Sequence, residues 1–222
     1  HPDPDALRHA LIRLALSQCR ERGFSTWHCN FVTADDLAAL TDHGLLQRHD
    51  WQFHWRNRGW ADFDQFLGSL SAKKRKNIRR ERRLVRDAGV DLELRTGQEM
   101  DDHLWARFYD FYRATFARKS GIPTLSLDFF RAIGQSLGSR VLVVLARRGG
   151  GYIAGALMLR SERALYGRHW GAIERVDGLH FEACYYQGLE YCLAHGLERF
   201  EPGAQGEFKI SRGFLPTPTW SA

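Results

Sequence analysis

Residues 140–171, RVLVVLARRGGGYIAGALMLRSERALYGRHWG, contain three runs rich in aliphatic and aromatic residues, at 140–147, 152–160 and 164–171. Short segments rich in Gly, Arg or Ser separate the runs. Runs of this length joined by short turns are typical of neighbouring antiparallel strands. The sequence therefore predicts a three-stranded meander at this point.

Periodicity predicts further elements on both sides of the meander. In chain order they are helices near 5–21 and 34–42, with a strand near 26–32 between them, a strand near 50–57, a long helix near 62–87, a strand near 90–95, helices near 99–118 and 127–137, and, after the meander, a helix near 180–195, a strand near 198–201 and a Gly-rich irregular segment to residue 222. This order predicts an α/β (α+β) fold with a mixed sheet flanked by helices.

The positive charge of the chain is concentrated in one segment. The formal net charge is +6, and residues 73–86, KKRKNIRRERRLVR, hold nine basic residues and one acidic one. On a helix, Ile78 and Val85 fall on one apolar stripe that docks on protein, while basic residues occupy the rest. The candidates for anion binding are Lys73, Lys74, Arg75, Arg79 and Arg80.

Two interpretations of this basic segment remain open. Like charges at i,i+4 repel, so such density indicates a polyanionic ligand: tRNA, the pyrophosphate of a lipid-linked or nucleotide-linked precursor, or an anionic membrane surface. The alternative is a solvated interdomain helix that acidic neighbours neutralise.

Composition excludes several classes of protein. With 44% hydrophobic residues the 222-residue chain can bury a core, and no apolar run is long enough to span a bilayer. We expect a soluble, cytoplasmic protein. The four cysteines and ten histidines show no metal-ligand spacing, so we predict reduced thiols and no metal.

The two ends of the chain resemble each other. A helix, a glycine and a strand around Cys19, Gly23 and Trp27 recur around Cys192, Gly196 and Phe200. This self-similarity predicts a tandem repeat: residues 1–60 as the C-terminal part of a first domain, 61–89 as a basic interdomain helix and 90–222 as a second domain that lacks its last strand. About 85 residues of the first copy are then expected before the start of the chain. The alternative is chance recurrence of a common helix–Gly–strand pattern.

Two blocks of the sequence resemble a known family. DFDQFLGSLSAKKRKNIRRERR, residues 62–83, resembles the interdomain motif of Fem-type peptidyl transferases, and the segment 179–216 is similar to the FemAB-like family of peptidoglycan biosynthesis or recognition. The resemblance covers nearly the whole chain and implies tandem acetyltransferase-like (GNAT) domains and N-acyl transfer. The family often has His where this chain has Phe208, which puts a polar contact there in doubt.

The connection at 172–179, AIERVDGL, bears on the acyl donor. A GNAT domain that uses acetyl-CoA needs a Gly-rich loop whose N–H groups converge on the pyrophosphate at a helix N-terminus. This connection has a single glycine, Gly178. We therefore expect no bound cofactor and favour aminoacyl-tRNA, the donor of Fem relatives, over acyl-CoA as co-substrate.

The segment EFKISRGF, residues 207–214, is a second candidate site. Lys209 and Arg212 lie between Gly206 and Gly213, where an anionic ligand can approach the backbone closely, although a solvated surface turn is the alternative. By the resemblance, Lys209 matches the Lys of the Fem-type Phe-Lys motif, which stabilises charge during acyl transfer. Glu182 and Glu207 are candidate bases for deprotonating the acceptor amine, and Glu182 is equally explained as a helix-start residue.

The strand at 164–171 carries residues that could bind the donor. Arg168, His169 and Trp170 lie on it, and strand alternation predicts that only one of Arg168 and His169 faces the cleft. The remaining candidates, Tyr185, Tyr186, Cys184 and Cys192, are interpreted as core residues, and no activated nucleophile is evident.

Together with the resemblance, these features predict an N-acyltransferase that passes an aminoacyl or peptidyl group to an amine of a cell-envelope precursor by direct attack. Its polyanionic partner is expected to be tRNA or a phosphate-bearing cell-wall intermediate. The alternative is a non-catalytic GNAT-like module that binds peptidoglycan fragments or nucleic acid through the basic helix. If most of the first domain is absent, the chain alone is expected to be inactive.

Overall fold

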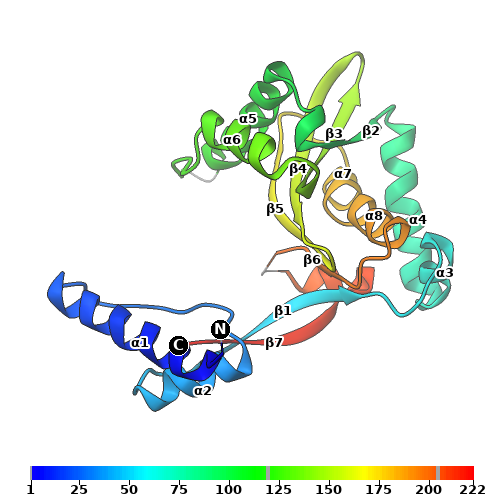
Figure 1. The fold of residues 1–222 in the computed structure, drawn as a ribbon. Coiled ribbons are helices and arrows are strands. Elements are labelled where there is room, and N and C mark those ends of the chain that lie inside the picture. The colour runs from blue at the N-terminus through cyan, green and yellow to red at the C-terminus, as the bar shows by residue number, and fades with distance from the viewer. Residues whose placement is uncertain (1, 119–120, 204–205) are drawn as a thin grey trace. The chain divides into compact units, whose positions relative to one another are not determined.

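The computed structural model describes residues 2–118, 121–203 and 206–222. Helices flank a seven-stranded mixed sheet of order β2-β3-β4-β5-β6-β1-β7 (Figure 1). The elements are α1 (Pro4–Glu21), α2 (Ala34–Asp42), β1 (Arg48–Arg56), α3 (Phe63–Gly68), α4 (Ala72–Asp87), β2 (Asp91–Thr96), η1 (Gly97–Glu99), α5 (Asp102–Ala117), α6 (Leu127–Leu137), η2 (Gly138–Arg140), β3 (Val141–Arg148), β4 (Gly151–Arg160), β5 (Ala164–Ala172), α7 (Leu179–Phe181), η3 (Glu182–Tyr186), α8 (Gln187–Ala194), β6 (Arg199–Glu201), η4 (Glu207–Arg212) and β7 (Leu215–Ser221).

The predicted meander is confirmed. Strands β3, β4 and β5 pair antiparallel in sequence order, and β2 pairs antiparallel with β3. Strand β6 pairs parallel with β5, and the connection through α7, η3 and α8 is long enough for the crossover that parallel pairing requires. The predicted α/β fold with a mixed sheet is thus also confirmed.

Alternate residues of β3 pack against different helical layers. Val141 and Val143 contact the cluster built on α5 and α6, whereas Leu142 and Val144 contact the cluster built on η3 and α8. Successive strand side chains point to opposite faces, so a strand covered on both faces has an uninterrupted apolar run. Figure 1 shows α5 and α6 on one face of β2–β5 and α7, α8 and α4 on the other.

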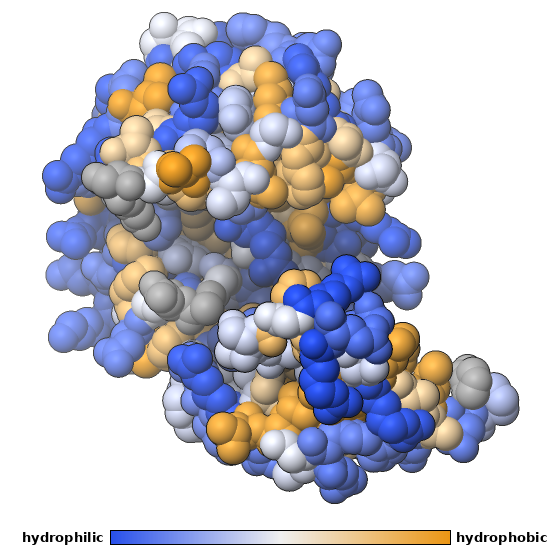
Figure 2. Space-filling view, turned by 90° about the vertical axis from the view of Figure 1, so that its left-hand side faces the viewer, coloured by the Kyte–Doolittle hydropathy of each residue, from blue (hydrophilic) through white to orange (hydrophobic). Residues whose placement is uncertain are grey.

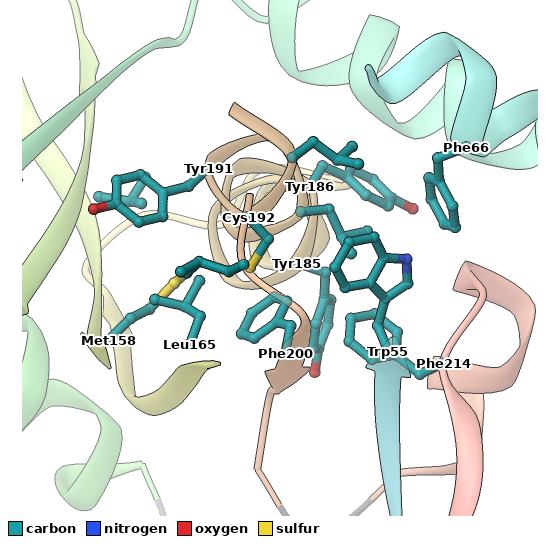
Figure 3. Packing of buried hydrophobic residues seen from close by; sticks show 14 of the residues in the cluster. Trp55, Phe66, Met158, Leu165, Tyr185, Tyr186, Tyr191, Cys192, Phe200 and Phe214 are labelled. Carbon is teal, nitrogen blue, oxygen red and sulfur yellow. The ribbon is translucent and has the colours of Figure 1, made fainter. Parts of the chain in front are cut away.

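The second of these layers is a large aromatic core. Tyr186 points toward Phe66 of α3, and Tyr185 lies beside Phe200 and Phe214 (Figure 3). Cys192 is fully buried in the same cluster. Tyr185, Tyr186 and Cys192 are therefore core residues, as predicted.

Helix α5 approaches β5 very closely at Gly171. A Cβ atom at this position would collide with the backbone carbonyl of Phe111. Thr115, one turn further along α5, donates from its hydroxyl to the Trp170 carbonyl at 2.8 Å. Glycine at 171 is thus required for the contact that holds α5 on the sheet.

The prediction of one long helix near 62–87 is wrong, because the chain forms two helices there. Asp62 caps α3, and Ser71 caps α4 by accepting a hydrogen bond from the Lys74 N–H at 3.5 Å. Ser and Asp side chains compete with the helix for backbone N–H groups, which favours a new helix start after Gly68.

Three further expectations need correction. The strand expected near 26–32 is reduced to one isolated bridge between Asn30 and Ser221. The segment to residue 222 is not all irregular, because η4 and β7 form within it; residues 204 and 205 of that segment lie outside the described residues. The helix predicted near 180–195 contains a π-helical turn, η3, which simple periodicity cannot reveal.

The chain divides into two compact units. The smaller unit contains residues 1–52 and 216–222, and the larger contains residues 53–215. Helices α3 and α4 thus belong to the same unit as the sheet from β2 to β6. The predicted boundaries, 1–60, 61–89 and 90–222, describe copies of a repeat, whereas the two units are defined by their compactness. The repeat itself stays a prediction.

The surface in Figure 2 consists mainly of hydrophilic residues interrupted by separate apolar patches. Among the helices of the described residues, none combines the length and apolar character needed to cross a bilayer.

Candidate active site

A small pocket lies where β5 and β6 begin to diverge. Its volume is about 100 Å³, and its walls come from β4, β5, the α7–η3 helix and the residues after β6. The lining residues are Ala156, Leu157, Met158, Gly167, Arg168, His169, Trp170, His180, Cys184, Tyr185, Pro202 and Gly203. The pocket thus brings together the strand predicted to bind the donor and part of the helix that follows it.

Lys209 lies against one wall of this pocket. Its side chain is 2% exposed, and its ammonium donates to the backbone carbonyl of Gly203, a lining residue, at 2.7 Å. Burial lowers the pKa of Lys209 to about 8, while Cys184 opposes the shift. The alternative of a solvated surface turn is therefore wrong for Lys209.

The same wall carries two further titratable groups, His180 and Cys184. Burial, followed by the positive charges of Arg212 and Lys209, lowers the pKa of His180 to about 4. Burial strongly raises the pKa of the Cys184 thiol. At neutral pH His180 is thus uncharged and Cys184 is a thiol, not a thiolate nucleophile.

A β-bulge changes the predicted alternation along β5. His169 pairs with Leu157 and Gly167 with Met158, so Arg168 is the extra residue between them. His169 packs against Tyr112 and Phe130, whereas Arg168 is exposed. Both residues border the pocket, while the His169 ring lies against α5 and α6, so which of the two faces the cleft stays a prediction. Trp170, the other predicted donor-binding residue, lines it from the α7 side and packs on His180.

The two candidate bases lie outside the pocket lining. Glu182 is 3% exposed, and its carboxylate accepts hydrogen bonds from Arg82 Nε at 3.1 Å and from Gln187 Nε2 at 2.9 Å. Glu207 is exposed in the first turn of η4. Glu182 thus joins the helix to α4 rather than bordering the pocket.

Arg212, predicted to bind an anion, is an internal residue. It is 4% exposed, and its Nη2 lies 2.6 Å from Oε1 of Glu81 in α4. Its Nη1 donates to the Phe208 carbonyl at 2.8 Å, and the guanidinium stacks 3.4 Å from the ring centroid of Phe181. Glu81 also accepts a hydrogen bond from the Tyr186 hydroxyl. These bonds occupy both terminal nitrogens of Arg212 and fasten η4 to α4.

Several cations of α4 also serve internal contacts. Arg82 forms a bidentate pair with Glu190, at 2.6 and 3.1 Å, in addition to its bond to Glu182. Lys74 donates to the Ile210 carbonyl at 2.9 Å, and Arg75 donates to the Leu70 carbonyl. The interpretation of acidic neutralisation is therefore correct for Arg82, and Lys74 and Arg75 are partly engaged with backbone.

The other side of α4 is solvent-exposed and basic. Lys73, Arg79 and Arg80 are exposed there, and Arg79 lies 3.9 Å from Asp64. A groove of about 400 Å³ runs between α3 and α4, lined by Phe63, Asp64, Leu67, Arg79, Arg82, Arg83 and Arg86. Of the five α4 cations predicted to bind anions, only Arg79 borders this groove.

Sequence reasoning missed Glu81, Gly203, and the part that His180 and Cys184 play in the pocket. Glu81 could have been found, because it is the single acidic residue within the basic segment 73–86. Gly203 acts through its backbone carbonyl, which carries no side-chain signal. Within the described ranges, no cluster of three or more His, Cys, Asp and Glu residues could hold a metal ion.

A mixed sheet whose two parallel strands border a pocket beside a following helix is a GNAT-like arrangement. The chain belongs to the FemAB-like family, described as a family of peptidoglycan biosynthesis or recognition, whose model matches residues 1–222. No curated protein matches the chain.

Solved structures show the same fold at low sequence identity. L-PGS from Bacillus licheniformis has a TM-score of 0.69 at 11% identity, over 96% of this chain and 72% of that chain. FemX has a TM-score of 0.61 at 12% identity, over 96% and 76% of the respective chains. A tandem GNAT protein from the clavulanic acid biosynthesis pathway has a TM-score of 0.53 at 14% identity, over 98% and 68%. These neighbours show that the fold of the chain is GNAT-like.

Proposed function

We propose that this chain carries the transfer site of a peptidoglycan-related N-acyltransferase. The site passes an aminoacyl or peptidyl group to an amine of a cell-envelope precursor by direct attack. The observation that carries the proposal is Lys209, a buried ammonium held by Gly203 at the wall of the pocket between β5 and β6. Titratable groups whose pKa is shifted by burial cluster at functional sites.

Lys209 has the charge that the reaction needs. With a pKa of about 8, its side chain is mainly protonated at pH 7. When the acceptor amine attacks the acyl carbonyl, negative charge develops on the carbonyl oxygen and then on the leaving oxygen. A desolvated ammonium stabilises both charges more strongly than a solvated one, because the local dielectric constant is low.

Two carboxylates are candidates for the base that removes a proton from the acceptor amine. Glu207 is the better of the two candidate bases, since it lies in the same 3₁₀ helix as Lys209 and its carboxylate is exposed. Glu182 is bonded to Arg82 and Gln187, so we propose that it stabilises the helix interface instead. Arg212 takes a similar supporting role through Glu81.

Aminoacyl-tRNA remains the donor that we favour. Gly178, the one glycine of the connection before α7, has φ +85°, and a Cβ there would lie 2.7 Å from the Glu81 carbonyl. This glycine is thus explained by the close approach of α4. The exposed arginines of the α3–α4 groove supply charge for a polyanionic donor or an anionic membrane surface.

The decisive experiment measures transfer by the full-length protein from labelled aminoacyl-tRNA to a peptidoglycan precursor peptide with a free amine. Lys209→Ala is expected to lower the transfer rate by about 10²–10³-fold, the usual effect of removing one transition-state donor. Arg13→Ala, an exposed cation of α1, serves as the control and should transfer like the wild type. Unchanged transfer by Lys209→Ala would refute the assignment of this site.

The exposed side of α4 also supports a second function, that of a non-catalytic module that binds nucleic acid or peptidoglycan fragments. Charge reversal at Arg79 and Arg83 separates the two functions. A loss of binding without any measurable transfer by the wild type, from either aminoacyl-tRNA or acyl-CoA, would favour the binding module. Transfer from acyl-CoA alone would refute the donor that we favour.

A further inference from the structure

A second, larger cleft lies where β5 and β6 begin. The two strands pair in parallel, with Ala164 opposite Arg199, and both run from this cleft toward the Lys209 pocket. The cleft has a volume of about 840 Å³. Small-molecule sites usually enclose about 300–1,000 Å³. The cleft is therefore large enough for a ligand of nucleotide size.

Four arginines from separate elements line this cleft. They are Arg56 at the end of β1, Arg140 in η2, Arg163 in the β4–β5 turn and Arg199 in β6. Such convergence is not the product of one basic helix, and it brings together residues that are far apart in the sequence. Among the residues that the structure describes, the lining includes no aromatic one, so it offers charge and hydrogen bonds rather than a stacking surface.

Two of the four arginines are engaged with carboxylates. Arg163 forms a bidentate pair with Glu198, at 2.8 and 2.7 Å, and Arg199 lies 2.6 Å from Glu201. Arg56 and Arg140 are exposed and make no ion pair with any residue that the structure describes. Their guanidinium groups are thus free to bind a ligand. Besides Glu198, the described lining contains one further carboxylate, that of the exposed Glu162.

Asn57 adds a neutral donor to this wall. Its side-chain oxygen accepts the N–H groups of Gly59 and Trp60, at 3.0 and 3.2 Å, which fixes the side chain. The amide nitrogen is then left as a donor. Planar guanidinium forks together with an oriented amide suit the oxygens of phosphate groups.

We propose that this arginine cleft binds a small molecule that carries a diphosphate group. Arg56 and Arg140 come from different elements, so one ligand with two linked anionic groups can bind both arginines at once. A single phosphate can satisfy fewer of these donors. The proposal does not depend on acyl transfer.

Titration calorimetry of the full chain with inorganic pyrophosphate and with ADP tests the proposal. The double variant Arg56→Gln/Arg140→Gln is expected to weaken binding of both probes at least tenfold. The matched control, Arg13→Gln/Arg20→Gln in α1, removes the same charge at two exposed arginines outside the cleft and should bind them like the wild type. Thermal unfolding checks that both variants fold, and exposure of all four side chains favours this.

Several outcomes would overturn the proposal. No binding of either probe by the wild type at millimolar concentration would do so, as would equal weakening by the two double variants, which indicates a general effect of charge. Binding of a short RNA oligonucleotide that depends on Arg56 and Arg140, without binding of pyrophosphate or ADP, would identify a nucleic-acid surface instead.

Discussion

Arg212 Nη2 lies 2.6 Å from Glu81 Oε1, and both side chains are almost completely buried. This ion pair joins η4, which carries Lys209, to the inner side of α4. The Tyr186 hydroxyl completes the network by donating to the same carboxylate. The position of the proposed catalytic lysine thus depends on the one acidic residue of the basic segment.

Glu81→Gln is expected to destabilise the protein by about 3–5 kcal/mol, because it leaves the buried Arg212 charge without a counter-charge. The measurement is the free energy of unfolding in urea. Asp64→Asn, at the exposed pair of Arg79 and Asp64, is the control and should cost less than about 1 kcal/mol. Similar losses for the two variants would show that burial of the Glu81 pair has no energetic consequence.

Arg82 and Arg83 are neighbours in α4 with different expected roles. Arg82→Ala leaves the buried carboxylate of Glu182 without its charged partner and should destabilise the protein by about 3 kcal/mol. Arg83 is exposed and forms no ion pair among the described residues, so Arg83→Ala should leave stability within about 0.5 kcal/mol of the wild type.

The same two variants distinguish an arginine that holds α4 against the rest of the protein from an arginine that binds a ligand. Affinity for tRNA, measured at a fixed salt concentration, should fall for Arg83→Ala, because removing a cation that neutralises a phosphate weakens binding and makes it less dependent on salt. Unchanged affinity and an unchanged salt slope would exclude Arg83 from the anion surface.

Gly171→Ala is expected to prevent stable folding, since its Cβ would collide with the Phe111 carbonyl in the contact between β5 and α5. Backbone atoms on both sides cannot move apart without separating the helix from the sheet. Gly68→Ala is the matched control: it meets nothing within 4 Å, and alanine favours the helix by up to about 1 kcal/mol. Circular dichroism and thermal unfolding should therefore separate the two variants clearly, and a well-folded Gly171→Ala protein would contradict the close approach.

Part of the fold and site could be predicted from the sequence. The runs of β3, β4 and β5 are apolar because both faces of the sheet are covered, and this gave a strong signal for a meander. The break between α3 and α4 was missed because the apolar stripe continues across Ser69–Ser71, although Ser71 prefers a cap. The bulge at Arg168 and the carbonyl of Gly203 depend on backbone geometry, which residue types do not encode. The ion-pair partners of Arg212 and Glu182 lie about 100 residues or more away in the sequence, so these pairs depend on tertiary packing.

The low pKa of Lys209 has opposite consequences for activity and for stability. The charged ammonium is lost as pH rises through about 8, so the transfer rate should fall there if the cation stabilises the oxyanion. Lys209→Arg keeps its charge at this pH and should flatten the profile, even if its rate is lower. A wild-type profile that shows no change near pH 8 would contradict the proposed role.

Stability should change in the other direction. The folded state releases the Lys209 proton near pH 8, whereas an unfolded lysine holds it to about pH 10.4. Between these values the unfolded state binds more protons, so this group makes the protein more stable as pH rises. Lys209→Met should remove that contribution, which unfolding measurements at pH 7.5 and 9.5 can detect.

His180 gives the corresponding effect in acid. Its pKa in the folded protein is about 4, because it is buried and lies close to Arg212 and Lys209. An unfolded histidine takes up a proton near pH 6.5, so the unfolded state binds more protons between pH 6.5 and 4. Stability is therefore lost as pH falls through this window, and His180→Asn should lose less stability than the wild type between pH 7 and 5. His28→Asn, at an exposed site, is the control and should follow the wild type. If His180→Asn also follows the wild type, the neutral buried imidazole does not contribute to acid sensitivity.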